Sequence, residues 1–380
     1  MTAPLAGILV ADFSRVLAGP LATATLADLG ADVIKVERPG SGDDTRAWGP
    51  PWTTNTSSYF EAPNRSKRSI TLDLEDPDDL AVAWRLAERA DIVVENFKTG
   101  TLARHGLGFV DVAARNPGVV YCSITGFGSG AGADLAGYDF LIQAVGGLMS
   151  ITGEPDGAPM KVGVALVDVL TAKDATTAIL AALRHRDATG QGQHVEVNLL
   201  SSLLGSLVNQ ASTYLSTGRE PSRMGNAHPS IAPYELLATA DAPLALACGN
   251  DAQFVRLVGV LGRADLATDP RFSTNPARVE HRPALVVELE RALAQATSAQ
   301  WVERLGAVGI PAGRVASIGE AFALARDLGL EPTVEVGDGR PAQVRHPATY
   351  SATPVERYVA PPTLGQHSDE IRRWLTEETA

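Results

Sequence analysis

One carboxylate stands out among the side chains that could do chemistry. Asp168 lies in KVGVALVDVLTA, where valine, alanine and leucine flank it on both sides. Removing a carboxylate from water costs free energy unless it gains a partner. Apolar residues continue at helical spacing to Leu183, so a helix is predicted to begin near Asp168. The free N–H groups and positive end of that helix favour the ionised form. Asp168 is therefore either an N-cap, which is the commoner role at such a place, or a nucleophile towards activated acyl groups.

A second group of candidates is cationic. Arg65, Lys67 and Arg68 form a short basic cluster in NRSKRSITLDL, and Arg38 and Arg104 each follow a predicted strand. Guanidinium and ammonium groups bind phosphate, and ligand crevices of open α/β sheets lie at the carboxyl ends of strands. The functional interpretation is a site for a phosphorylated ligand. The alternative is a solvated loop that precedes a strand.

Several familiar catalytic signatures are missing from the sequence. DFSRVLAGP follows the first predicted strand in place of GxGxxG, and the patterns GxxxxGK[ST], HExxH and GxSxG do not occur. Cys122 and Cys248 make neither a disulfide framework nor a metal-binding pair, and the apolar run around Cys122 indicates a buried residue. His228 and His367 are expected to form hydrogen bonds in a loop and at a helix start. Nicotinamide, flavin and P-loop chemistry are therefore disfavoured.

The first 200 residues must position these side chains. Short β-branched runs alternate there with helical patterns, which predicts an α/β fold with a mostly parallel sheet and helices on both faces. Asp76 and Pro77 predict an N-cap and the first turn of one helix. The predicted strands are GILVADF, ADVIKVE, DIVVEN, VVYCSITGF and HVEVNLL, and the helices are PLATATLADLG and DPDDLAVAWRLAERA.

The pattern changes after about residue 215. Turn-forming residues dominate the segment STGREPSRMGNAHPSIAPYE, which is typical of a linker. A shorter region with a different composition follows. It contains helical patterns at 251–262, 282–298 and 299–309, a loop-rich strand region at 309–322, and a closing helix at 368–378.

Composition narrows the class of protein. The 380 residues are 45% apolar and 20% charged, which is enough for a large domain with a smaller partner, and the net charge is −12. The negative charge argues against bulk binding to nucleic acid or acidic membranes. The N-terminus lacks a secretion signal, and no apolar run reaches the roughly 18 residues of a membrane span. A cytoplasmic location is expected.

Together these segments resemble the class III CoA-transferase family, or CaiB/BaiF type, which contains formyl-CoA transferase, carnitine CoA-transferase and α-methylacyl-CoA racemases. The resemblance covers essentially the whole chain, and the matching segments occur in family order. They are PLAGILVADFSRVLAGPLATATLADLGADVIKVERPGSGDDTR, NRSKRSITLDL, DIVVENFKTGTLARHGLG, SITGFG, GYDF, KVGVALVDVLTA, GQGQHVEVNLL and APPTLGQHSDEIRRWL.

The resemblance implies an architecture. It implies a large domain with a Rossmann-like open parallel sheet, built from the N-terminal half and the C-terminal segment, and a smaller inserted α+β domain. The expected division is a large domain at 1–215, a linker at 216–228, a small domain at 229–315, and a linker with the return to the large domain at 316–380. Two such chains are expected to form an interlocked, ring-like homodimer.

The resemblance also implies a reaction. Asp168 falls on the family's nucleophilic aspartate, so catalysis is now favoured over a cap. CoA would move from an acyl-CoA donor to a free carboxylic acid through an aspartyl–acyl anhydride and an aspartyl-CoA thioester. Coenzyme A and acyl-CoA enter as substrates, and no tightly bound cofactor or metal is implied. The expected partners are these substrates and a second copy of the chain, with no nucleic acid and no membrane.

The CoA site carries over position by position. Residues that match the nucleotide, pyrophosphate and pantetheine contacts of the family occur in six segments. Gly137 stands where some members have a lysine, so that contact is expected to be either lost or left to the backbone. The candidate CoA-binding residues are Val16, Leu17, Arg38, Leu72, Asp73, Leu74, Glu75, Asn96, Phe97, Lys98, Arg104, Gly137 and Tyr138.

Two other functions compete with transfer. The racemases of the family use a histidine and an aspartate as an acid–base pair. Their GHD segment reads GYDF here, and Tyr138 is a poor base near neutral pH because tyrosine has a pKa of about 10. This substitution favours transferase over racemase. The remaining alternative is a non-catalytic CoA-binding subunit of a heteromeric transferase, against which the retained Asp168 argues.

Overall fold

The computed structural model describes residues 3–377. The chain divides into two compact units. Unit 1 contains the residues up to 148, 161–219 and those from 331 onward, and unit 2 contains 149–160 and 220–330. The two units are described separately below.

Unit 1 is built on a six-stranded sheet in which all neighbouring strands run parallel. The strand order β3-β2-β1-β4-β5-β6 reverses between β1 and β4, and this is the switch point of a doubly wound fold. The predicted Rossmann-like α/β fold is therefore confirmed. The strands are β1 (Leu9–Asp12), β2 (Asp32–Glu37), β3 (Lys67–Thr71), β4 (Ile92–Glu95), β5 (Val120–Thr125) and β6 (Gln193–Asn198).

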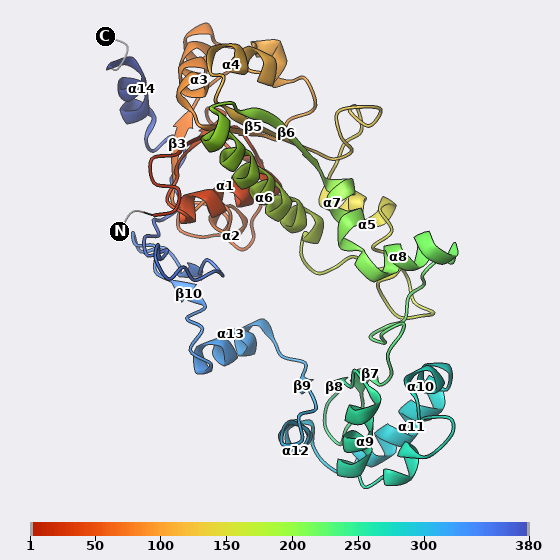
Figure 1. The fold of residues 1–380 in the computed structure, drawn as a ribbon. Helices are drawn as coiled ribbons and strands as arrows, with labels where there is room; N and C mark the ends of the chain where they lie inside the picture. The colour runs from red at the N-terminus through yellow and green to blue at the C-terminus, as the bar shows by residue number, and fades with distance from the viewer. Residues whose placement is uncertain (1–2, 378–380) are drawn as a thin grey trace. The chain divides into compact units, whose positions relative to one another are not determined.

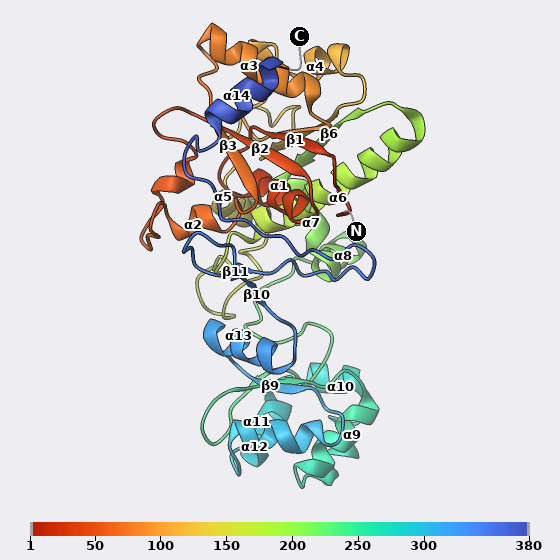
Figure 2. The same cartoon turned by 90° about the vertical axis from the view of Figure 1, so that its left-hand side faces the viewer.

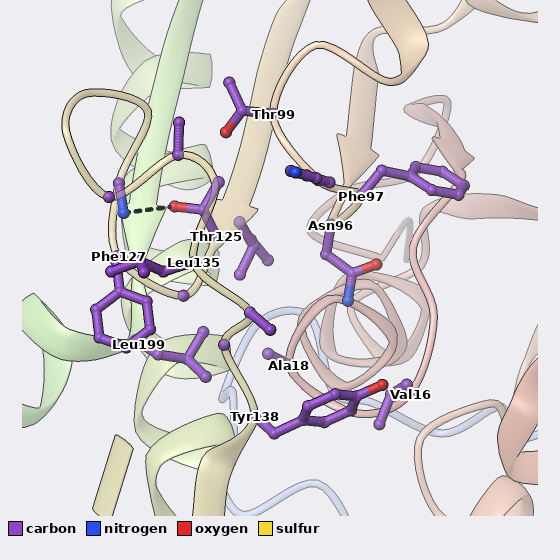
Figure 3. Close-up of a pocket in the computed structure, with 18 of the residues that line it drawn as sticks. Val16, Ala18, Asn96, Phe97, Thr99, Thr125, Phe127, Leu135, Tyr138 and Leu199 are labelled. Carbon is purple, nitrogen blue, oxygen red and sulfur yellow. Dashed lines mark hydrogen bonds between the residues drawn. The ribbon is translucent and has the colours of Figure 1, made fainter. Parts of the chain in front are cut away.

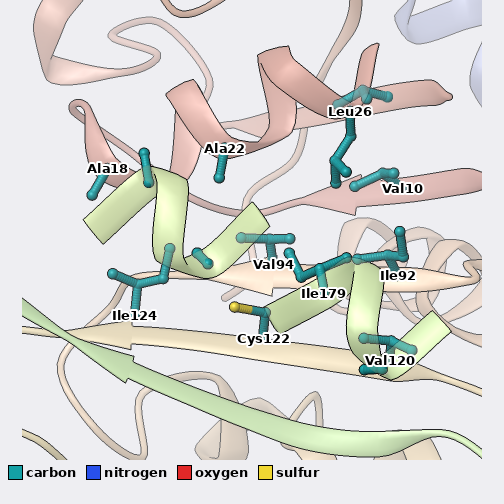
Figure 4. Close-up of a cluster of buried hydrophobic side chains, with 14 of the residues drawn as sticks. Val10, Ala18, Ala22, Leu26, Ile92, Val94, Val120, Cys122, Ile124 and Ile179 are labelled. Carbon is teal, nitrogen blue, oxygen red and sulfur yellow. The ribbon is translucent and has the colours of Figure 1, made fainter. Parts of the chain in front are cut away.

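Helices cover both faces of this sheet (Figures 1 and 2). Successive strand residues point to opposite faces; Val10 of β1 lies in the core beneath α1 and α6, whereas Leu9 and Ala11 lie in the core beneath α3, α4 and α14. Figure 4 shows the first of these cores. The helices of unit 1 are α1 (Ala18–Asp28), α2 (Ser58–Glu61), α3 (Pro77–Arg89), α4 (Phe109–Arg115), α5 (Asp139–Val145), α6 (Leu166–Thr189), α7 (Leu199–Ser206), α8 (Val208–Thr217) and α14 (Ser368–Glu377).

Unit 2 is an α+β fold with its own apolar core. Its three strands form an antiparallel sheet in the order β7-β8-β9. The elements are β7 (Tyr234–Leu237), β8 (Leu244–Ala247), α9 (Asp251–Val260), α10 (Asn275–Glu280), α11 (Arg282–Leu293), α12 (Ser298–Gly306), β9 (Ala312–Arg314) and α13 (Ile318–Asp327). In unit 1 a short antiparallel pair, β10 (Thr333–Val334) and β11 (Gln343–Val344), precedes α14.

Most predicted elements are confirmed, and two are wrong in part. Asp76 caps α3 as expected, because its carboxylate accepts hydrogen bonds from the N–H groups of Asp78 and Asp79. The interpretation of the basic cluster as a solvated loop fails, because Lys67 begins β3 and is buried. The region read as loop-rich strand contains the start of α13, where Ser317 forms a capping box. Residue 378 of the predicted closing helix lies outside the described residues.

Residues 3–377 contain neither a candidate membrane span nor a candidate metal-binding cluster. No helix in this range combines the length and the apolar character needed to cross a bilayer. Within the same residues, histidine, cysteine, aspartate and glutamate side chains do not gather in groups of three or more that could hold a metal ion.

Candidate active site

A cavity of about 400 Å³ opens at the carboxyl ends of the strands on both sides of the switch point. Its wall comes from the β1–α1 loop, the loops after β4 and β5, and the start of α6 and α7 (Figure 3). Open α/β sheets bind ligands at this position. The lining residues include Asp168 and the predicted residues Val16, Leu17, Asn96, Phe97, Lys98, Gly137 and Tyr138.

Asp168 lies in the first turn of α6, which begins at Leu166. It is not the N-cap, because the cap position is Ala165 and makes no side-chain bond. The cap function falls to Asp139, whose Oδ1 accepts hydrogen bonds from the N–H groups of Val167 at 2.8 Å and of Asp168 at 3.4 Å. The Asp168 carboxylate is thereby left for another role, which removes the cap interpretation.

The electrostatic environment of Asp168 differs from the expectation. Burial and, after it, the charge of Asp139 raise the pKa of Asp168 from 3.8 to about 7. The helix end was expected to favour the ionised form. That expectation is wrong because desolvation and a like charge act in the opposite direction and are larger. A carboxyl group with a pKa near 7 is typical of functional sites rather than of surface aspartates.

One aromatic residue within electrostatic range of this carboxylate was not among the sequence candidates. Tyr59 lies on the single-turn helix α2, and burial and the charges of Asp168 and Asp139 raise its pKa to about 12. Its hydroxyl therefore stays protonated and can donate a hydrogen bond. The Trp48 ring packs edge-on against Tyr59, with 5.3 Å between the ring centroids. Only the tertiary fold brings this turn to α6, and no sequence pattern marks it.

A second cavity of about 200 Å³ adjoins the first at Arg15 and Phe97, which line both. It lies at the carboxyl ends of β1, β2 and β3. The Arg15 guanidinium lies over the Phe97 ring, 4.9 Å from its centroid. The predicted residues that line this cavity are Arg38, Leu72, Asp73, Leu74 and Glu75, together with Phe97.

Asn96 lines the larger cavity and also makes a contact that its place in the sequence did not imply. Its Oδ1 accepts a hydrogen bond from the Arg15 N–H at 2.7 Å, and its Nδ2 donates to the Arg15 carbonyl at 2.6 Å. The side-chain amide therefore holds the β1–α1 loop in place. Sequence spacing gives no sign of this contact, because the two residues are 81 positions apart.

Gly137 marks a close approach of two chain segments. A Cβ atom built on Gly137 would lie 2.3 Å from the Cα of Gly126. This conformation excludes any side chain at position 137, which agrees with a contact left to the backbone. Tyr138 follows as the residue before α5, and its side chain is largely exposed at the cavity.

Arg104 and the basic cluster lie elsewhere. Arg104 is exposed on a short 3₁₀ helix and lines neither cavity. The three cations of the cluster are already paired: Arg65 with Asp28, Lys67 with Asp12, and Arg68 with Asp32. The pairs of Arg65 and Lys67 are buried or nearly so and that of Arg68 lies at the surface, and none of the three residues lines either cavity. Lys98 lines the first cavity and pairs with Asp134 at 2.8 Å.

The remaining sequence candidates are structural. Cys122 and Cys248 are free and buried, and burial raises the pKa of the Cys122 thiol to about 12. His228 and His367 each accept a backbone hydrogen bond through Nδ1, from Ser230 and from Ser69. These side chains serve packing and local geometry, as predicted.

Comparisons with known proteins agree with this geometry. A family model described as CoA-transferase family III matches residues 5–368. Succinate–glutarate CoA-transferase of Agrobacterium fabrum is 48% identical over 97% of this chain and 94% of the relative. Succinyl-CoA:glutarate CoA-transferase of Mus musculus is 41% identical over 97% of this chain and 85% of the relative. The crystal structure of a CAIB/BAIF family protein from Brucella suis superposes with a TM-score of 0.89 at 43% identity, covering 99% of this chain and 100% of that one.

Proposed function

Because this chain belongs to CoA-transferase family III, we propose that Asp168 is the group through which it passes CoA from an acyl-CoA donor to a carboxylic acid. CoA transfer between acyl-CoA and carboxylic acids is the activity of its named relatives and of this class of enzyme. The observation that carries the proposal is the position of Asp168, the carboxylate with a pKa near 7 in the cavity at the switch point.

The proposed route balances at every step. An Asp168 oxygen attacks the thioester carbonyl, the C–S bond breaks, and a mixed anhydride and CoA thiolate form. The thiolate attacks the aspartyl carbonyl, which releases the donor acid and leaves an aspartyl-CoA thioester. The acceptor carboxylate attacks this thioester and regenerates an anhydride and thiolate. The thiolate then attacks the acceptor's acyl carbon, which gives the new acyl-CoA and restores the Asp168 carboxylate.

The two adjoining cavities suit the two ends of the CoA ester. We assign the nucleotide end to the smaller cavity, where Arg38 and the segment 72–75 form the wall, and the thioester to the larger one. The Arg38 side chain is half exposed, so its guanidinium is accessible to phosphate even though it pairs with Asp44 at 2.6 Å. Arg104 can contribute only from the exposed rim of this site.

We propose short dicarboxylic acids as substrates. The relatives named above act on succinate or glutarate, which carry a second carboxylate that stays free in the CoA ester. Among the described residues that line the larger cavity, the cations are Arg15 and Lys98. Lys98 is engaged by Asp134. Arg15 pairs with Asp44 only at 3.4 Å, and its Nε is buried without a hydrogen-bond partner in the described part of the chain. Arg15 is therefore the proposed partner of the free carboxylate.

Substitution of Arg15 tests this substrate class. We expect Arg15→Gln to raise the KM for glutarate or succinate about tenfold or more, because a hydrogen bond to a charged group contributes about 1.5–3 kcal/mol. The KM for a monocarboxylate such as butyrate should change little. An equal change for both kinds of acceptor would contradict the assignment.

The assembly is proposed to be the interlocked homodimer. Large apolar side chains on α5, α7 and α8 are exposed in the single chain, and contiguous apolar patches are rare on monomers. The predicted domain division, 1–215, 216–228, 229–315 and 316–380, stays a proposal, and it differs from the two compact units because residues 149–160 and 316–330 belong to unit 2. Light scattering on the purified protein should give twice the mass of the chain. The residues concerned are Leu141, Val145, Leu204, Val208 and Leu215.

The decisive experiment combines a substrate panel with one substitution. Acyl-CoA donors are tested against carboxylic acids, and Asp168 adducts are trapped and located by mass spectrometry. Asp168→Ala should abolish transfer and leave CoA binding within a few-fold. Substantial turnover by that variant would contradict the mechanism. Exchange of the α-proton of a 2-methylacyl-CoA in deuterated water, without an acceptor acid, would favour the racemase instead.

A further inference from the structure

The loop between β1 and α1 adopts a backbone conformation that its sequence does not favour. Val16 has φ of +70°, in the left-handed region that a β-branched residue rarely adopts. Val16 and its neighbours Arg15 and Leu17 line the larger cavity together with Asp168. Strained conformations of this kind persist only when the surroundings hold them in place. The contacts that hold this loop therefore shape the cavity wall.

A buried ion pair makes the first set of these contacts. The Asp43 carboxylate accepts hydrogen bonds from the Val16 N–H at 3.2 and 3.3 Å. Lys35 Nζ lies 2.9 Å from Asp43 Oδ2 and donates to the Ser14 carbonyl at 2.9 Å. Both charged side chains are fully buried. The Lys35–Asp43 pair thus forms hydrogen bonds with the backbone of Ser14 and Val16, on either side of Arg15.

A second buried pair supports the start of the loop. Lys67 Nζ lies 3.0 Å from Asp12 Oδ2, and both side chains are fully buried. Asp12 Oδ1 accepts the Ser14 N–H at 3.0 Å, and its Oδ2 accepts the Thr23 hydroxyl at 2.7 Å. Each of the two pairs is neutral in itself. Together with Asn96 they restrict the backbone of the segment 14–16.

Burying two ion pairs is an expensive way to stabilise a fold. The desolvation of both partners often cancels their attraction, so apolar residues of similar volume give equal or greater stability. Ordinary core packing therefore does not require charges here. What charges provide is direction, because each group needs a partner at a defined place.

We propose that the Lys35–Asp43 pair is a positioning device that holds Val16 in its left-handed conformation and so fixes the wall of the CoA site. The inference rests on the proposed function, because it takes the two cavities to bind CoA. Neither residue is assigned contact with the reacting atoms. Both side chains are fully buried, although both residues also line the smaller cavity. They are proposed to act through the main chain of the β1–α1 loop, and direct contact with CoA is the explanation that the test must separate from this one.

The test replaces the pair by apolar residues and relieves the strain separately. The double substitution Lys35→Met with Asp43→Leu removes both charges; methionine is similar in size to lysine, whereas leucine is larger than aspartate. Val16→Gly makes the left-handed conformation accessible without the pair, because glycine adopts positive φ freely. The control, Asp28→Asn, removes one partner of the buried Arg65–Asp28 pair at the far end of α1. Dissociation constants for free CoA, KM for acyl-CoA, kcat and melting temperature are measured for each.

The expected result separates binding from stability. The double variant should bind CoA about tenfold more weakly, with KM raised and kcat changed less. Its melting temperature should fall, because the N–H groups of Val16 and Thr45 lose their acceptor. In the Val16→Gly background the same double substitution should weaken binding less than threefold. A direct loss of contact with CoA would persist in that background. Asp28→Asn should lower the melting temperature and leave CoA binding within twofold.

Three outcomes would overturn the inference or its premise. Unchanged CoA binding in the double variant would refute the inference, and so would an equal loss with and without Val16→Gly. Wild-type protein that does not bind CoA would refute the proposed function instead. If the double variant does not fold, Asp43→Asn, which keeps the acceptor oxygen but removes the charge, must show the same dependence on Val16→Gly or the inference fails.

Discussion

Neutralising the proposed nucleophile should make the protein more stable. The pKa of Asp168 rises from 3.8 to about 7 on folding because of burial and the charge of Asp139. Below about pH 4 the carboxyl group is protonated in both the folded and the unfolded chain, so its pKa contributes no penalty. As pH rises towards 7 the unfolded chain ionises first, and the folded state loses relative stability. Above about pH 7 the loss is complete. Asp168→Asn avoids this loss because the amide stays neutral.

The magnitude follows from the shift. A pKa unit corresponds to about 1.4 kcal/mol, so the rise gives an upper figure of about 4 kcal/mol at pH 8. Asp168 lines a cavity and keeps partial contact with water, which screens the charge, so we expect about 2 kcal/mol. For a unit of this size that is a rise in melting temperature of about 4–8 °C.

Calorimetry from pH 5 to pH 8 measures this difference. Asp168→Asn should melt higher than the wild type at pH 8, and the gap should narrow towards pH 5. Asp174→Asn is the matched control, because Asp174 is exposed on the same helix and its substitution should change stability by less than about 0.5 kcal/mol. If Asp168→Asn melts lower than the wild type at pH 8, or if the gap does not depend on pH, the carboxylate is not destabilised by its surroundings and the reasoning is refuted.

Three further predictions follow from the same geometry. The kcat/KM for transfer should rise with pH through about 7, because attack needs the ionised Asp168; a flat profile between pH 5.5 and 8 would contradict this. Asp139→Asn should move that limb to lower pH, since it removes the like charge and keeps the oxygen that caps α6; a limb that stays in place would assign the whole shift to burial. Gly137→Ala should destabilise unit 1 by about 1–3 kcal/mol in denaturant titrations, because its Cβ would meet the Gly126 backbone, whereas Gly130→Ala, with open space around it, should not.

The fold was largely readable from the sequence. Strands buried on both faces appear as apolar runs, and helices between them show a 3.6-residue period, so β1, β2, β4, β5 and β6 were all identified. The start of β3 was misplaced, because Lys67 and Arg68 occupy its first two positions and were read as part of a loop that precedes a strand. A charged residue in a central sheet is readable only when its partner is known, and the partner of Lys67, Asp12, lies 55 positions away.

In the candidate site, too, the features set by local sequence could be predicted and those set by distant contacts could not. The place of Asp168 near the start of a helix follows from local periodicity, and so do the loops that carry most predicted CoA contacts. The cap of that helix and the hydrogen bonds that hold Arg15 depend on contacts of Asp139 and Asn96 with distant segments, and Tyr59 feels the charge of Asp168 across a similar separation in sequence. Such pairings follow from the tertiary fold, and one chain without aligned relatives does not reveal them.

These missed contacts bear on why the carboxylate would react. An ionised Asp168 is disfavoured by burial and by Asp139. Acylation, as proposed, turns it into a neutral anhydride, so both penalties disappear as the bond to the acyl carbon forms. The energy that raises the pKa in the resting enzyme is thus available to the first chemical step. A carboxylate with a pKa near 7 is also a stronger nucleophile than an ordinary aspartate, because nucleophilicity rises with basicity. Asp139→Asn lowers the pKa of Asp168 and should therefore slow formation of the anhydride. The comparison is made at pH 8, where Asp168 is ionised in the wild type and in the variant, by rapid-quench measurement of the first turnover.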